Sequence, residues 1–190
     1  MISHYKDFEI QVDDDLSYTH NSADNIMSYD KAYIDDDKYY QPNSKHGIRV
    51  FENETLISSA IICESGGITS IHDRLFVVFG DAIFICCSDT VYALTIPHLE
   101  LKWRKKLDSA TCFEIYSFEG DLIVHGEISI SRVTPEGEIK WEFSARDIFV
   151  NLNGHKEFEI IGGQIKLVDF ENYEYILDAN GEVIIDRLLK

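Results

Sequence analysis

From Gly47 to the end of the chain, short apolar runs alternate with shorter polar clusters. The runs are about five to seven residues long and are separated by Gly, Asn, Asp and Pro, a pattern typical of strands joined by tight turns. Every connection is short enough for a hairpin, so neighbouring strands are expected to be antiparallel, with no room for the crossovers of a parallel α/β fold. The expected strands span residues 48–51, 55–63, 74–79, 82–87, 90–96, 100–106, 111–118, 122–125, 127–133, 138–143, 158–161, 164–170, 173–177 and 182–188.

Three segments within this pattern resemble one another. They are residues 91–103 (VYALTIPHLELKW), 129–141 (SISRVTPEGEIKW) and 173–185 (YEYILDANGEVII). Each reads as a strand, a turn and a second strand that ends on a bulky apolar residue: Trp103, Trp141 and Ile185, with Ile57 as a candidate in an earlier, degenerate copy. A period near 40 residues with four short strands per unit is typical of a β-propeller blade, which buries its faces by stacking on its neighbours.

The first of these segments resembles the repeat of PQQ-type propellers, in which a strand, a turn, a glycine and a blade-ending tryptophan follow one another. Gly137 and Trp141 match that glycine and tryptophan, and Gly181 matches the glycine with Ile185 in the tryptophan position. The first copy keeps its tryptophan but has Leu99 where the glycine stands in the pattern. The resemblance implies blade-like packing rather than quinone chemistry, so no cofactor is expected.

The resemblance covers about half of the chain, and the length leaves room for about four units. We therefore predict an all-β fold of antiparallel β-meander repeats, arranged as a small or incomplete β-propeller-like array, with a β-sandwich as the alternative. Residues 111–149 also resemble uncharacterised bacterial proteins, which implies no activity.

Residues 1–46 differ from the repeat domain expected over residues 47–190. This segment is acidic and rich in tyrosine, and residues 21–33 have only weak helical spacing. It is expected to be either an irregular arm packed on the repeats or an ordered edge of them. Its two aspartate runs lack the spaced ligands, the glycine and the bidentate glutamate of an EF-hand loop, so no metal is expected there. The runs comprise Asp13, Asp14, Asp15, Asp35, Asp36 and Asp37.

The net charge of −17 and the pI near 4.6 restrict the class of partner. Such a chain repels phosphate backbones and anionic lipids, which argues against nucleic-acid and membrane-surface roles, and it attracts a basic protein. The sequence shows no signal-peptide pattern and no apolar stretch of the roughly 20 residues that a membrane span needs. Four cysteines without a disulfide-like spacing predict reduced thiols and a cytoplasmic location: Cys63, Cys86, Cys87 and Cys112.

The strongest candidate for catalytic chemistry is a histidine beside carboxylates. His125 and Glu127 share one face if their strand is continuous, and Asp147 and Cys112 are possible neighbours. A histidine–carboxylate pair can act as an acid–base pair or bind a metal. No nucleophile motif or phosphate-binding loop accompanies it, so a hydrogen-bonded structural histidine that anchors a turn is the competing interpretation.

Two further clusters carry less weight. Cys86-Cys87, with Cys63, Cys112 and His72, lacks the Cys-x-x-Cys spacing of zinc sites, so no metal is expected. Residues 104–106, the one basic cluster, are expected either to balance the acidic N-terminal segment or to protect a strand edge.

These observations support three hypotheses for function. The preferred one is a non-catalytic protein-binding module, in its most concrete form an acidic immunity-type inhibitor of a basic toxin, with the six aspartates of residues 13–15 and 35–37 as binding residues. The second is a hydrolase or other enzyme that uses His125 and Glu127. The third is a structural or regulatory protein that completes a propeller with another chain or with a second copy of itself.

Overall fold

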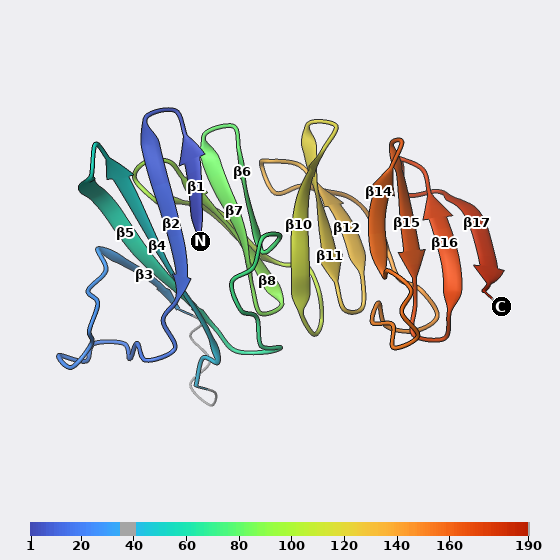
Figure 1. Ribbon diagram of the computed structural model, residues 1–190, viewed down its shortest axis with the longest axis horizontal. Helices are drawn as coiled ribbons and strands as arrows, with labels where there is room; N and C mark the ends of the chain where they lie inside the picture. The colour runs from blue at the N-terminus through green and yellow to red at the C-terminus, as the bar shows by residue number, and fades with distance from the viewer. Residues whose placement is uncertain (35–40, 190) are drawn as a thin grey trace.

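The computed structural model describes residues 1–34 and 41–189, which form four β-sheets and, within these ranges, no helix. The sheets follow one another along the chain and lie in a row (Figure 1). Sheet A contains β1 (Ile2–Tyr5), β2 (Phe8–Asp14), β3 (Lys31–Ile34), β4 (Ser44–Glu52) and β5 (Thr55–Glu64). Sheet B contains β6 (Phe76–Phe79), β7 (Ala82–Cys87), β8 (Thr90–Thr95) and β9 (Leu101–Lys106). Sheet C contains β10 (Cys112–Phe118), β11 (Asp121–Gly126), β12 (Ile130–Val133) and β13 (Ile139–Phe143), and sheet D contains β14 (Phe158–Ile161), β15 (Gln164–Val168), β16 (Tyr173–Leu177) and β17 (Val183–Leu188).

Sheets B, C and D are four-stranded antiparallel meanders, as the short connections predict. The all-β, β-propeller-like prediction is therefore confirmed, with one small sheet per repeat and an open row rather than a sandwich. The exception to antiparallel pairing is β3, which pairs parallel to β5 at the edge of sheet A.

The N-terminal segment belongs to sheet A. β2 pairs with β4 along its whole length, and the expected division between residues 46 and 47 falls inside β4. The connection from β2 to β3 contains turns and bends, and it brings Tyr18 and Tyr29 against Ile61 and Cys63. The Tyr29 ring also lies over Gly47, where a β-carbon would clash with it. Residues 15–30 thus cover part of the face of sheet A that points away from sheet B.

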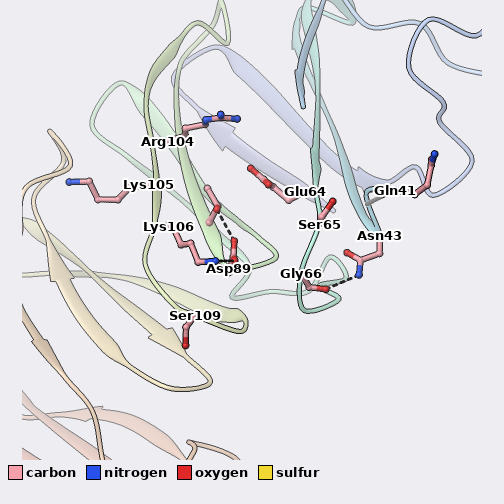
Figure 2. Close-up of a pocket in the computed structure, with 11 residues that line it drawn as sticks. Gln41, Asn43, Glu64, Ser65, Gly66, Asp89, Arg104, Lys105, Lys106 and Ser109 are labelled. Carbon is pink, nitrogen blue, oxygen red and sulfur yellow. Dashed lines mark hydrogen bonds and ion pairs between the residues drawn. The ribbon is translucent and has the colours of Figure 1, made fainter. Parts of the chain in front are cut away.

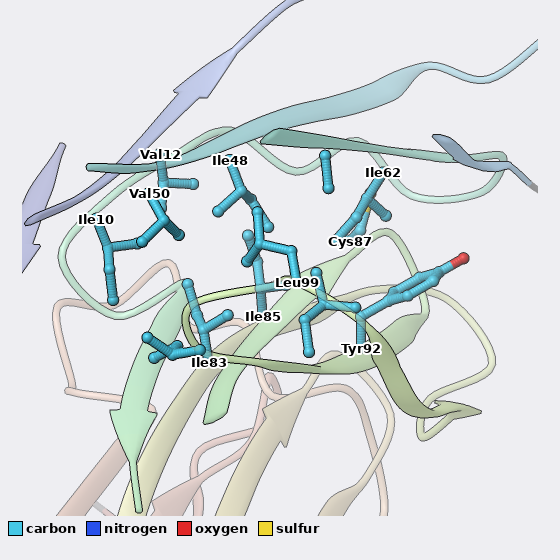
Figure 3. Packing of buried hydrophobic residues seen from close by; sticks show 13 residues of the cluster. Ile10, Val12, Ile48, Val50, Ile62, Ile83, Ile85, Cys87, Tyr92 and Leu99 are labelled. Carbon is cyan, nitrogen blue, oxygen red and sulfur yellow. The ribbon is translucent and has the colours of Figure 1, made fainter. Parts of the chain in front are cut away.

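One apolar core fills each junction between neighbouring sheets. Figure 3 shows the first core, in which Ile10 and Ile48 of sheet A face Ile83, Ile85 and other residues of sheet B. A second core joins sheet B to sheet C, and a third joins sheet C to sheet D. Each sheet therefore buries the face that meets a neighbouring sheet, as expected for repeats of this kind.

The glycine–tryptophan pattern read from the sequence corresponds to a contact repeated between sheets. Trp103 Nε1 of sheet B donates a hydrogen bond of 2.9 Å to the carbonyl of Pro135 in sheet C, and its ring lies against Gly137. Trp141 repeats this geometry on sheet D, with a 2.9 Å hydrogen bond to the carbonyl of Ala179 and its ring against Gly181. Both tryptophans thus hold the last turn of the following sheet.

The last antiparallel strand of every sheet contains a β-bulge. Its position shows that Ile57, the residue expected to correspond to the tryptophans, is not their equivalent. In sheets B and C the bulge lies one residue before the tryptophan, and in sheet A it lies at Ile57, one residue before Ser58. Ser58 Oγ donates to the carbonyl of Pro97, in the manner of the tryptophans. Ser58, rather than Ile57, therefore occupies the tryptophan position of sheet A.

Candidate functional site

His125 lies in the junction between sheets C and D. Its Nδ1 lies 2.8 Å from Oε2 of Glu114 on the neighbouring strand β10. Its ring stacks on Phe158 of sheet D, with ring centres 4.9 Å apart, and meets Phe113 and Phe149 edge-on. The side chain is 7% exposed, and its Nε2 has no hydrogen-bond partner among the described residues.

The carboxylates expected beside His125 lie elsewhere. β11 ends at Gly126, so Glu127 lies beyond the strand, where its backbone bonds to Thr111 and Phe149. The Asp147 carboxylate accepts a hydrogen bond from the next residue in the chain. The register of β10 against β11 places Glu114, not Glu127 or Asp147, beside His125. The sequence pattern did not resolve this register.

The environment of Glu114 keeps it ionised. Burial opposes ionisation, but hydrogen bonds from His125 and Tyr116 outweigh burial and lower the pKa of the carboxyl. Among the described residues no group of three or more His, Cys, Asp or Glu side chains is arranged to hold a metal. This pair therefore holds sheet C together and presents no open nucleophile or ligand set.

The first aspartate run holds sheet A to its surroundings. Asp13 pairs with Arg49 and lies 3.4 Å from the N-terminal ammonium group. Asp14 lies 2.8 Å from Nδ1 of His46 and accepts a hydrogen bond from the backbone of Ile71, in the connection to sheet B. Burial lowers the pKa of His46, although Asp14 acts in the opposite direction.

Asp15 is engaged in the same way, because its carboxylate accepts a 3.0 Å hydrogen bond from Tyr29 and another from Ser17. The predicted binding residues Asp35, Asp36 and Asp37 lie outside the described residues. The described half of the predicted binding site is thus occupied with internal contacts.

A cavity of about 780 Å³ opens between sheets A and B (Figure 2). Its walls include the buried carboxylates of Glu64 and Asp89 and the side chains of Arg104 and Lys106 from β9, the edge strand of sheet B. Lys106 Nζ lies 2.5 Å from Asp89. The basic cluster therefore lies on an exposed strand edge, which was one of its two expected positions.

Further contacts of this cavity among the described residues are also internal. Tyr92 donates to Glu64, and Arg104 lies 3.4 Å from the Tyr92 hydroxyl. Lys105 points away from the cavity in Figure 2 and donates to the carbonyl of Gly137. The cavity is a polar cleft of mixed charge whose named groups support the junction between the sheets.

The first and third hairpin turns of the meanders lie along one edge of the array. This follows from antiparallel order within each sheet and from the tryptophan contacts between sheets, and Figure 1 shows several of these turns along the top. They carry eight exposed carboxylates, here called the acidic turn edge: Asp7, Glu54, Asp81, Glu100, Glu119, Glu136, Glu138 and Glu182. These acidic residues are scattered singly along the sequence, so only the topology brings them together.

Ion pairs with described cations involve three of these carboxylates. Lys102 lies 3.3 Å from Asp81, Lys31 lies 3.4 Å from Glu100, and Arg132 lies 3.5 Å from Glu119. These three carboxylate side chains are 72%, 65% and 53% exposed, so solvent weakens the pairs. The acidic turn edge is therefore an accessible surface to which all four sheets contribute carboxylates, with Lys6, Lys102 and Lys140 on the same edge.

Among the solved structures that resemble this chain, one with a TM-score of 0.50 supports the fold. The chain is similar to BamB from Moraxella catarrhalis, with a TM-score of 0.50 and 13% identity over 75% of this chain and 44% of that one. The quinohemoprotein alcohol dehydrogenase ADHIIG from Pseudomonas putida HK5 is 16% identical, with a TM-score of 0.45, over 60% of this chain and 20% of that one. The chain spans less than half the length of either structure.

Sequence comparisons add no family. No family model matches the chain, and no curated protein matches it. No helix in the described part of the chain is long and apolar enough to cross a membrane. The structural likeness, at these low identities, concerns the propeller-like fold and leaves the function to be argued from the surface.

Proposed function

We propose that this protein is a non-catalytic protein-binding module that captures a basic protein through the acidic turn edge. The observation that carries the proposal is the collection of exposed carboxylates from all four sheets on one side of the array. With a net charge of −17, this surface accelerates the encounter with a basic partner and orients it.

The most concrete version is an immunity-type inhibitor. A basic toxin such as a nuclease has a cationic active-site surface, and a rigid acidic edge can cover such a surface. The proposed setting is the cytoplasm, in line with four cysteines that are all free and buried. The repeats themselves are proposed to be related to PQQ-type repeats in their strand order and glycine–tryptophan contact, and the proposal includes no cofactor.

The geometry favours binding over catalysis. An enzyme built on His125 and Glu127 needs both groups at an accessible site, whereas His125 is buried against Phe158 and bonded to Glu114. A protein that completes a closed propeller needs both end sheets open; residues 15–30 cover part of the outer face of sheet A, so within the described chain sheet D alone offers an uncovered end.

Capture from a lysate of the native host, at low and at high salt, tests the proposal. We expect a basic protein to be retained at low salt and released at high salt, because screening weakens contacts between exposed charges. Mass spectrometry identifies the retained proteins. Capture that is independent of salt, or the absence of any basic protein, contradicts the proposal.

A further inference from the structure

The bulged residue of the last strand marks equivalent positions in sheets B, C and D. In sheet B the bulged residue is Lys102, whose Nζ lies 3.3 Å from Asp81 at the start of the second strand. In sheet C it is Lys140, whose Nζ lies 2.7 Å from Asp121 at the same place. An ion pair thus joins the second and fourth strands of both internal sheets at the turn edge.

Sheet D lacks both members of this pair. Its bulge lies at Ile184, and Gln164 follows Gly163 as Asp81 follows Gly80 and Asp121 follows Gly120. Isoleucine and glutamine cannot form the ion pair. The loss of both charges together leaves an uncharged surface where sheets B and C are polar.

Two more positions of sheet D also have aliphatic side chains where sheet C has polar or hydrogen-bonding ones. In sheet C, Arg132 is paired across the strands with Trp141, and both donate to the carbonyl of Ala179 in the next sheet. In sheet D the corresponding cross-strand pair is Ile176 and Ile185. Groups that hold the turn of a following sheet are therefore replaced by aliphatic side chains.

We call Ile161, Ile176, Ile184 and Ile185 the isoleucine patch. Ile161 lies opposite Gln164 on the adjoining strand and is 56% exposed, and Ile184 is 52% exposed. Ile176 and Ile185 are half-buried. The patch lies on the last sheet of the row, and no further sheet of the described chain covers that end (Figure 1).

The rest of this face is polar and internally paired. Glu174, whose side chain is 6% exposed, lies 3.4 Å from Lys166 and 2.5 Å from Arg187. The exposed isoleucines of this face therefore lie beside the acidic turn edge, where Glu182 is exposed, whereas the exposed Leu188 lies at the far end of β17. An apolar centre with a charged border is the usual anatomy of a protein interface.

We propose that the isoleucine patch is the apolar centre of the interface with the basic partner and receives an apolar side chain flanked by Lys or Arg. The inference rests on the proposed function for the charge of the partner. A second copy of this chain is a poor occupant, because two molecules with a net charge of −17 repel each other. The patch provides affinity by burial, and the acidic turn edge provides steering.

A charge-balanced double variant isolates the patch. Gln164→Asp with Ile184→Lys rebuilds the ion pair of sheets B and C, so the fold is retained and the net charge is unchanged. The matched control, Ser70→Asp with Ile68→Lys, makes the same exchange at exposed residues between sheets A and B.

The probe is the acetylated and amidated peptide Lys-Leu-Leu-Lys, titrated into the isotope-labelled protein and followed by NMR. We expect saturable shifts of the amide signals of Ile176 and of residues 183–185, with binding at least about tenfold weaker in the double variant and unchanged in the control. The peptide Lys-Ser-Ser-Lys, with the same charge, is expected to bind at least about tenfold more weakly than the leucine peptide.

Three results overturn the inference: equal binding of both peptides, binding that the double variant retains, or a dimer of the wild type that the double variant abolishes in sedimentation. The titration does not depend on the lysate experiment. If no basic protein is captured but the leucine peptide binds the patch, the proposed function is wrong and the patch remains a binding site. If a basic protein is captured but the peptide does not bind, only the inference about the patch is wrong.

Discussion

The ring of Trp103 lies against the α-carbon of Gly137 in the following sheet, so closely that a β-carbon at Gly137 would stand 2.9 Å from the ring. The glycine also has φ of 88°, in the left-handed region. This contact, with the hydrogen bond from the same indole to Pro135, joins sheet B to sheet C. The repeat therefore depends on a glycine for space as well as for conformation.

Gly137→Ala is expected to lower the free energy of unfolding by about 2–4 kcal/mol, because alanine is strained at positive φ and its methyl group collides with the indole. Gly120→Ala is the matched control: Gly120 has φ of 85° and no atom within 4 Å of the added carbon. The control is expected to cost about 1 kcal/mol. Equal losses of stability in urea denaturation would contradict the contact.

His125→Phe tests the structural role of the histidine. The substitution removes the Nδ1 partner of Glu114 and is expected to cost about 2–3 kcal/mol, because a partly buried carboxylate loses a hydrogen bond. A second change, Glu114→Leu, is expected to restore part of this loss. Glu127→Gln is expected to change stability by less than about 0.5 kcal/mol. Recovery in the double variant, measured by urea denaturation, distinguishes this coupling from simple loss of packing.

The stability of the protein is expected to fall as the pH drops below about 6.5, the ordinary pKa of histidine. Burial lowers the pKa of His46 in the folded state, so the unfolded chain binds more protons between the two pKa values. The free energy of unfolding is therefore undiminished by His46 above about pH 6.5, and it falls as the pH is lowered below that value. Urea denaturation from pH 8 to pH 5 measures the slope. His46→Asn is expected to flatten the slope and the exposed His98→Asn to leave it unchanged; equal slopes in all three proteins contradict the assignment.

The four cysteines are expected to be unreactive in the folded protein. All are buried, and burial raises the pKa of Cys63 to about 12 and that of Cys87 well above its usual value. Little thiolate is therefore available to attack a reagent at neutral pH. A thiol titration with Ellman's reagent is expected to show all four groups in urea and less than one in the native state. Fast reaction of a native thiol would contradict the packing of these strands.

The strands after residue 47 were predictable because tight turns separate them. The glycine and tryptophan of the repeat were visible as a pattern, but the pattern did not show that Trp141 contacts Gly181 of the following repeat. Two features were hidden for a physical reason. The equivalence of Ser58 with the tryptophans appears only when the bulge at Ile57 is known. The pairing of Glu114 with His125 depends on the register between β10 and β11, which the sequence does not show. Sheet A was predicted in part: β4 and β5 follow the tight-turn pattern, and an ordered edge was one of the two expectations for residues 1–46, but the pattern did not indicate the parallel pairing of β3 with β5.

The candidate site was the least predictable feature. Aspartate runs such as residues 13–15 attract attention in a sequence, but their described members are used in internal contacts. The acidic turn edge consists of single residues, such as Glu54 and Glu182, that are far apart in sequence. Only the stacking of sheets places them on one side, and a pattern read along the chain does not contain that information.

The most direct test of the account is capture of the basic partner by a turn-edge variant. This variant carries Glu136→Gln, Glu138→Gln and Glu182→Gln, and its control carries Asp24→Asn, Asp73→Asn and Glu171→Gln, which change the charge equally at exposed residues away from that edge. We expect low-salt capture to fall at least about tenfold in the turn-edge variant and to persist in the control. Equal capture by the two variants would contradict the claim that the acidic turn edge is the binding surface.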